Sequence, residues 1–166
     1  DLLRKYFTHP AITTDVIVGF PGETEEEFKI TEEYLKKIHF YEMHIFKYSV
    51  REGTKAAVMP DQVPEDVKRD RIYRLIELVN ATAEGVNESL RGRVVEVMVD
   101  GPSERDASIL AGRTRSNKMV HWRPQSGSPQ GELAPGCMAM VRVVEPRTWT
   151  LHGEAADVAR KAGRVD

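Results

Sequence analysis

The sequence predicts an α/β fold that continues into a long helix and a small all-β barrel. A β-branched segment at 13–20 runs into a Gly-Pro turn and an amphipathic helix, and a second apolar segment follows at 41–48. One long helical pattern then extends from Pro64 to about Leu90. Five short strand-like segments occupy most of the chain from Arg93 to Glu154, separated by turn residues.

The composition is that of an ordinary folded protein. Hydrophobic residues make up 40% and charged residues 30% of the 166 residues, and the formal net charge is −2. This charge excludes binding of nucleic acid through overall charge, although region 91–154 has a small excess of Lys and Arg that permits a basic face. No apolar run approaches the roughly 20 residues of a membrane span, so we expect no membrane partner.

The chain has a single cysteine, Cys137. One thiol can form no internal disulfide and cannot by itself ligate an iron–sulfur cluster or a zinc ion. We therefore expect Cys137 to be a small buried side chain in a strand. The low cysteine content favours a cytoplasmic location.

The first strand, 13–20, has an unusual polar residue. Val16 and Val18 share one face of it, and Asp15 and Ile17 the other. A strand covered on both faces is apolar on both, so Asp15 is either held by a neighbouring backbone group or arginine, or it points into a ligand-filled barrel. No strand precedes this one, so we expect a piece of a longer protein that self-associates through open edges at 13–20 or 41–48.

The turn after this strand leads into a helix with clear start signals. Gly19 and Gly22 permit a sharp turn and the close approach of a ligand. Thr24 and Glu27 have the spacing of a capping box. The glutamates at 23–27 favour the positive end of the helix dipole and argue against a phosphate at this turn. The apolar stripe of this helix comprises Phe28, Thr31, Leu35 and Ile38.

The strand–helix–strand order predicts that segments 13–20 and 41–48 pair in parallel. Their carboxyl ends then lie at one edge of the sheet, and Lys47, Tyr48 and Arg51 join the rim there. In the long helix, the basic cluster is expected to be a solvated face, with binding to a nucleic-acid backbone as the alternative. That cluster comprises Lys68, Arg69, Arg71 and Arg74.

The strands predicted in the second half lie at 94–100, 109–113, 118–123, 137–144 and 149–154. Short strands with Gly-, Pro- and Ser-rich turns are typical of a small closed or partly open barrel of the OB type. We expect Trp122 and Trp149 to lie in its core, a long loop at 124–136, and a weakly helical tail at 155–166.

One run in the barrel region, GRTRSNKMVHWR at 112–123, combines cations with Asn, His and Trp. Arg and Lys suit phosphates, whereas unpaired RNA bases need aromatic or guanidinium surfaces on which to stack. An ordinary polar hairpin is the alternative. We favour RNA contact, with these candidates: Arg113, Arg115, Lys118, His121 and Arg123.

Two longer segments, TTDVIVGFPGETEEEF and HIFKYSVREGTKAAVMPDQVPEDVKRDR, resemble the later part of the radical SAM methylthiotransferases. The segment KYSVREGTKAAVMPDQV favours the branch that modifies threonylcarbamoyladenosine beside the tRNA anticodon. Sister branches act on isopentenyladenosine in tRNA or on a ribosomal-protein aspartate. The region 94–154, with GRTRSNKMVHW and LHGEA, resembles the TRAM domain of these enzymes.

The resemblance implies four parts. These are the last βα units of an incomplete radical SAM (TIM-like) barrel at 1–63, a connecting helix at 64–92, a TRAM barrel at 93–154 and a tail at 155–166. The rival interpretation is a free-standing RNA-binding module without catalysis.

The resemblance also implies S-adenosylmethionine and two 4Fe-4S clusters as cofactors. The cluster cysteines would lie in a missing N-terminal part, so this chain is expected to hold no catalytic residue or metal ligand and to be inactive alone. The implied partner of the small barrel is a tRNA anticodon stem-loop, and Lys47 and Arg51 would form a substrate rim. The implied S-adenosylmethionine contacts are Asp15, Gly19, Phe20, Gly22, Phe46 and Tyr48.

Overall fold

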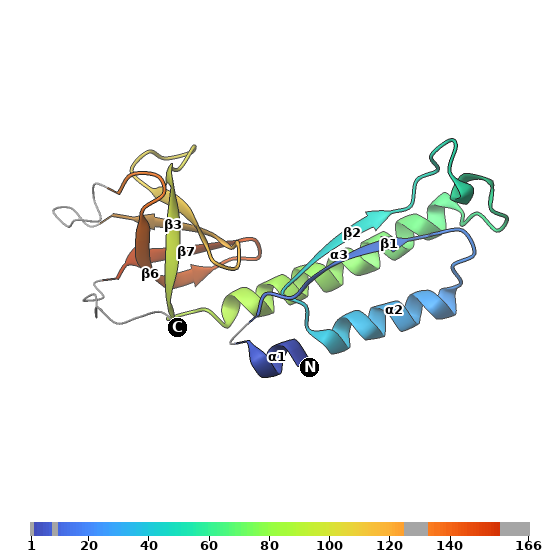
Figure 1. Cartoon of the computed structure of the whole chain (residues 1–166), viewed down its shortest axis with the longest axis horizontal. Helices are drawn as coiled ribbons and strands as arrows, with labels where there is room; N and C mark the ends of the chain where they lie inside the picture. Colours follow the sequence, from blue (N-terminus) through green and yellow to red (C-terminus); the bar gives the residue numbers. More distant parts are fainter. Residues whose placement is uncertain (1, 8–9, 125–132, 157–166) are drawn as a thin grey trace. The chain divides into compact units, whose positions relative to one another are not determined.

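The computed structural model describes residues 2–7, 10–124 and 133–156. The chain forms two compact units, Asp1–Ala83 and Glu84–Asp166. The first contains helices and a parallel pair of strands, and the second contains a β-barrel (Figure 1). The four-part division into 1–63, 64–92, 93–154 and 155–166 stays a prediction.

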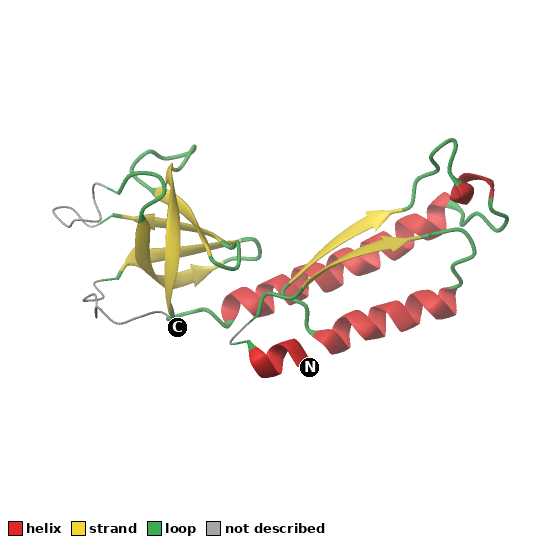
Figure 2. Ribbon diagram, in the orientation of Figure 1, coloured by secondary structure: helices red, strands yellow, loops and turns green. Residues whose placement is uncertain are grey.

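The first unit is built from alternating helices and strands (Figure 2). Strands β1 and β2 pair in parallel from Thr13 opposite Glu42 to Val18 opposite Lys47, which confirms the predicted parallel pairing. Its elements are α1 (Leu2–Tyr6), β1 (Thr13–Val18), α2 (Glu25–Ile38), β2 (Glu42–Lys47), the 3-10 helix η1 (Lys55–Val58) and the first part of α3 (Glu65–Glu88).

One face of the β1–β2 pair is covered and the other is open. Val18 and Met43 are buried among side chains of α2 and α3, including Phe28 and Leu75. The alternate positions are exposed, as the strand period of two requires. Among the described residues this sheet has two strands, so an incomplete TIM-like barrel and self-association through the open edges stay predictions.

The second unit is a closed barrel with the strand order β3-β4-β5-β7-β6. All neighbouring strands are antiparallel except β5 and β7, which run parallel. The expected small closed barrel is confirmed. Its strands are β3 (Val94–Pro102), β4 (Leu110–Thr114), β5 (Met119–Arg123), β6 (Met138–Pro146) and β7 (Thr150–Ala155).

The interior of the barrel is narrow. Trp122 is 1% exposed in the core, as predicted, and packs among valines and Leu151. A Cβ atom at Gly112 would lie 2.3 Å from the carbonyl oxygen of Met98, so the walls approach too closely there for any side chain.

Two predictions about the barrel were wrong at residues that immediately precede a strand. Trp149 is 55% exposed rather than buried, because β7 begins one residue later, at Thr150. Cys137 is exposed because it lies in the turn before β6, where its amide bonds the carbonyl of Ala134. The predicted tail lies outside the described residues beyond position 156, as do residues 125–132 of the predicted loop.

Candidate functional site

The turn between β1 and α2 is closed by a carboxylate. The Gly19 amide donates to Glu23 Oε2 at 2.6 Å, and the Gly22 amide donates to the Asp61 carbonyl at 2.9 Å. Both glycines have positive φ, 74° and 87°. A Cβ at Gly19 would lie 2.3 Å from Cγ of Lys68, so only glycine fits between the turn and α3.

The predicted capping box is present. The Thr24 hydroxyl accepts from the Glu27 amide at 3.2 Å, and the Thr24 amide donates to Glu27 Oε2 at 2.9 Å. This backbone hydrogen bond from Thr24 lowers the pKa of Glu27. The cap fixes the start of α2 beside the glycine turn.

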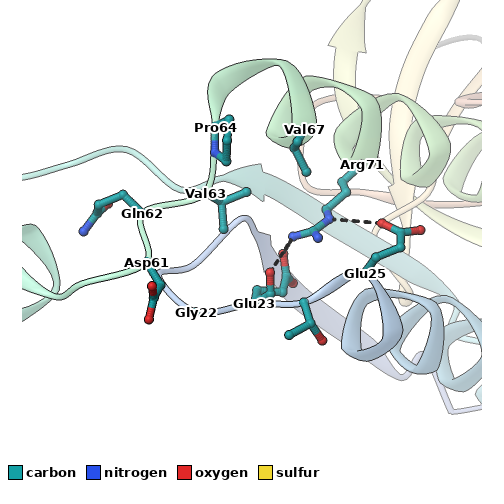
Figure 3. A pocket seen from close by; sticks show the side chains of 10 residues that line it. Gly22, Glu23, Glu25, Asp61, Gln62, Val63, Pro64, Val67 and Arg71 are labelled. Carbon is teal, nitrogen blue, oxygen red and sulfur yellow. Dashed lines mark hydrogen bonds and ion pairs between the residues drawn. The ribbon is translucent and has the colours of Figure 1, made fainter.

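The basic cluster of α3 is only in part the solvated face that was predicted, because Arg69 is exposed but Lys68 and Arg71 are buried. Lys68 is 4% and Arg71 is 2% exposed. Arg71 Nη1 lies 2.6 Å from Glu23 Oε2 and 3.2 Å from the Glu23 carbonyl oxygen, and its Nε lies 3.6 Å from Glu25 Oε2 (Figure 3). Burial of so polar a side chain is tolerated because carboxylates surround it.

A second arginine extends this network along α2. Arg74 bonds Glu25 at 2.8 Å and also pairs with Glu32, and its guanidinium lies 4.5 Å from the Phe28 ring centroid. The hydrogen bond to Arg74 lowers the pKa of Glu25, and the same bond raises the pKa of Arg74. The glutamates predicted only as helix-start residues therefore also neutralise the buried Arg71 and the half-buried Arg74.

A pocket of about 470 Å³ lies beside this network (Figure 3). Its lining combines the turn at Gly22–Glu25 with the segment Asp61–Pro64, and Val67 and Arg71 close it from α3. Because the Arg71 guanidinium is bound by Glu23 and Glu25, the pocket does not present it to a phosphate. That the turn holds no phosphate stays a prediction.

The candidate S-adenosylmethionine residues fall into two groups. Asp15 and Phe46 lie on the open face of the β1–β2 pair, with Ile17 opposite Phe46 and His44 opposite Asp15. Ile17 is 57% and Phe46 53% exposed. The Asp15 carboxylate has no hydrogen bond or ion pair with a described residue, and both interpretations of Asp15, held by a neighbour or facing a ligand, stay predictions.

The other candidates gather at the carboxyl ends of the strands. Phe20 and Tyr48 make an edge-to-face contact with ring centroids 5.3 Å apart, and Lys68 Nζ lies 5.3 Å from the Tyr48 ring. The Tyr48 hydroxyl is buried and has no hydrogen-bond partner within the described part of the chain. Gly19 and Gly22 shape this edge but their amides are already bonded within the protein.

The two rim candidates differ. Lys47 Nζ is 2.7 Å from Glu65 Oε2, whereas Arg51 is exposed on the loop after β2. Glu65 also bonds Lys68 at 2.9 Å. The hydrogen bond from Lys47, followed by that from Lys68, lowers the pKa of Glu65 to about 2.

The candidate RNA contacts around the β4–β5 turn are paired with acids. Arg113 lies 3.5 Å from Asp100, Arg115 3.1 Å from Glu96, and Arg123 3.8 Å from Asp106. These arginines remain exposed and can exchange partners, because surface ion pairs are weak. Lys118 is only 8% exposed, so its side chain is not open to solvent as a phosphate contact requires.

The fifth candidate, His121, has a neighbour that the sequence did not indicate. It stacks on His152, with ring centroids 5.3 Å apart and 30° between the planes. The two residues are register partners on the parallel strands β5 and β7. Sequence reasoning missed His152 because parallel pairing of these two strands has no local signal.

The described residues contain no group of three His, Cys, Asp or Glu side chains that could hold a metal ion. Cys137, the one cysteine of the chain, is exposed in the barrel unit. The donor set therefore does not fit a 4Fe-4S cluster. Within the described part of the chain, no helix is long and apolar enough to span a membrane.

Comparison with curated proteins shows extensive similarity. The chain is 44% identical over 160 residues to the tRNA-2-methylthio-N(6)-dimethylallyladenosine synthase of Thermoanaerobacter sp. (strain X514), covering 96% of this chain and 33% of that protein. It is 42% identical over 155 residues to the synthase of that name from Fusobacterium nucleatum, covering 93% of this chain and 34% of that protein. It is 41% identical over 161 residues to the synthase of that name from Halalkalibacterium halodurans, which covers 97% of this chain and 29% of that protein. No protein-family model matches.

The chain spans about a third of the length of these relatives. Their names agree with the expected family of tRNA-modifying methylthiotransferases and contradict the threonylcarbamoyladenosine branch. The alternatives, a free-standing RNA-binding module and the ribosomal-protein branch, fit no better.

Residues of the segment KYSVREGTKAAVMPDQV, which favoured the wrong branch, have structural roles in the fold. Thr54 caps η1, and the side-chain amide of Gln62 donates from Nε2 to the carbonyls of Ala56 and Met59. Residues that fold a loop carry little information about the base that an enzyme modifies.

Proposed function

We propose that this chain is part of a longer tRNA-2-methylthio-N(6)-dimethylallyladenosine synthase, in which its first unit contributes one wall of an S-adenosylmethionine site and its barrel contacts the tRNA. The observation that carries this proposal is the 44% identity over 160 residues to a synthase of that name. A cytoplasmic location accompanies this function, since tRNA is modified there in bacteria.

The open face of β1 and β2 suits the nucleoside part of S-adenosylmethionine. Ile17 and Phe46 provide exposed apolar surface for an adenine ring, and the Asp15 carboxylate is an acceptor for ribose hydroxyls. At the strand ends, the Tyr48 hydroxyl, which has no hydrogen-bond partner among the described residues, can donate to a polar atom of the ligand.

When bound, S-adenosylmethionine supplies the methyl group and the radical that the resemblance implies. The residues of this chain hold and orient it, and Phe20 packed on Tyr48 shields the end of the site from water. The 4Fe-4S clusters would be bound by cysteines elsewhere in the longer protein, since this chain has only Cys137. We assign no catalytic step to this chain.

The substrate is tested with the full reading frame that encodes this chain. The purified, reconstituted enzyme is incubated with tRNA carrying dimethylallyladenosine and, separately, with tRNA carrying threonylcarbamoyladenosine, and nucleosides are analysed by mass spectrometry. We expect a methylthio product from the first tRNA alone. No product from the first tRNA, in an enzyme that cleaves S-adenosylmethionine, overturns the proposal.

The cofactor wall is tested in the same enzyme. Phe46→Ala is expected to weaken S-adenosylmethionine binding about tenfold, because a buried aromatic contact of this size contributes on the order of 1–2 kcal/mol. The control is Ile30→Ala, an exposed apolar residue on α2. Equal affinities for the two variants would remove Phe46 from the site.

A further inference from the structure

The outer surface of β5 and β7 carries a feature unlike the arginine–acid pairs of the β4–β5 turn. His121 and His152 stack with ring centroids 5.3 Å apart, and both are half-buried. Leu151 and Trp122 alternate with them and point into the core, so the two imidazoles lie on the outside of the barrel. The Thr150 hydroxyl lies 3.5 Å from Nε2 of His152 on the same strand.

The surroundings of the pair are predominantly cationic. Burial lowers the pKa of His121, and Arg105 and Arg147 lower it further. Burial also lowers the pKa of His152, followed by Arg147 and His121, while Glu145 opposes the shift. Both pKa values are lowered, which favours the uncharged form of both rings at neutral pH.

The groups around the pair come from every neighbouring element. Arg105 belongs to the β3–β4 connection and has no ion pair with a described residue. Glu145 at the end of β6 pairs with Arg147 at 3.0 Å, and on β4 the register partner of His121 is the uncharged Ala111. The next outward positions on β5 and β7 are Arg123 and Glu154, which are paired in register.

We infer that the stacked His121–His152 pair receives an unpaired nucleobase of RNA. Arg105 and Arg147 hold the flanking phosphates. Two uncharged heteroaromatic rings offer a stacking surface and hydrogen-bonding edges, and adjacent guanidinium groups supply the charge that a phosphodiester needs. This inference rests on the proposed function, and it locates the RNA contact of the barrel on β5 and β7 in addition to the basic turn.

A phosphate at the arginines has a second effect. Its negative charge offsets the arginine charge that disfavours protonation, so the pKa of each histidine rises in the complex. A group with a higher pKa in the bound state takes up a proton on binding. RNA affinity should therefore increase as the pH falls from about 8 to about 6.

The experiment measures binding of this chain to a tRNA anticodon stem-loop at about pH 8 and about pH 6, at fixed salt. His121→Ala/His152→Ala is expected to weaken binding about tenfold and to abolish the pH dependence. His121→Gln/His152→Gln keeps polar side chains of similar size but removes the rings, and should give the same loss. The control His39→Asn changes an exposed histidine at the C-cap of α2, where the positive φ of 54° suits Asn, and should leave affinity unchanged.

The outcomes separate the two proposals. If the unaltered chain binds no RNA, the proposed RNA-contact role of the barrel fails together with the inference. If it binds and both double variants bind equally well with the same pH dependence, only the inference fails. Nuclear magnetic resonance of the imidazole protons gives an independent reading, because the inference requires the pKa values of His121 and His152 to rise when RNA is added.

Discussion

The buried charge network between α2 and α3 makes the stability of the first unit depend on one carboxylate. In Glu23→Gln the side chain keeps an oxygen that can accept from Gly19 but loses the charge facing Arg71, whose side chain is 3% exposed. Breaking a buried pair by removing one partner typically costs about 3–5 kcal/mol, because the remaining charge is uncompensated. Glu25 remains 3.6 Å from Arg71 Nε and compensates in part, so we expect roughly 2–3 kcal/mol.

Two spectroscopic probes can follow the two units separately. Both tryptophans, Trp122 and Trp149, lie in the barrel unit, so their fluorescence follows the barrel. Far-ultraviolet circular dichroism follows the helices, which are mainly in the first unit. With a urea m-value of about 1–2 kcal/mol/M, the dichroism midpoint of Glu23→Gln should fall by about 1–3 M, with the fluorescence midpoint unchanged.

The matched control is Glu26→Gln. Glu26 lies in the same first turn of α2 but is exposed and has no ion pair with any described residue. Its free energies of unfolding, from both probes, should equal those of the unaltered chain within about 0.5 kcal/mol. If Glu23→Gln behaves like Glu26→Gln, the Arg71 charge does not depend on Glu23 and the argument from burial is refuted.

Three further changes test separate features. Thr24→Ala should destabilise the helical unit by about 1 kcal/mol through loss of the capping box, and an unchanged dichroism midpoint would show that the cap contributes nothing. Gly112→Ala should destabilise the barrel by about 1–3 kcal/mol, seen as a lower fluorescence midpoint, because its Cβ meets a backbone carbonyl. Gly85→Ala, with open space around it, should stabilise α3 by up to about 1 kcal/mol, and equal effects would contradict the close approach of the strands. The pKa of Glu65 is lowered from 4.5 to about 2. The contribution of its carboxylate to the stability of the fold is therefore complete above pH 4.5 and is lost as the pH falls toward 2. Urea midpoints of Glu65→Gln should therefore vary less with pH in that window, and parallel curves would exclude the contribution.

Local features of the fold could be predicted from the sequence. The capping box at Thr24 and the alternation of Val16 and Val18 with Asp15 depend on residues a few positions apart, and both appear as expected. The barrel strands were also recognisable, since each is bounded by turn residues. Errors at Cys137 and Trp149 arose at strand ends, where a shift of one residue exchanges core for solvent.

Features that depend on distant pairing could not be predicted. The sequence showed Arg71 only as one cation of a helical cluster, but its partner Glu23 is 48 residues away. The stack of His121 on His152 likewise requires the parallel pairing of β5 with β7. In both cases the partner determines whether a charged or titratable side chain is solvated, buried or held neutral.

The narrowness of the barrel affects how its motifs are interpreted. Gly112 lies in the GRTRSNK segment and Gly153 in LHGEA, and at each a Cβ would come within 2.4 Å of a carbonyl oxygen of the adjoining strand. Any sequence that builds this barrel with the same strand spacing needs glycine at both positions, whatever ligand it binds. A sequence match at these two glycines indicates the barrel architecture. The identity of the ligand has to be sought at the outward-facing positions between them and beside them.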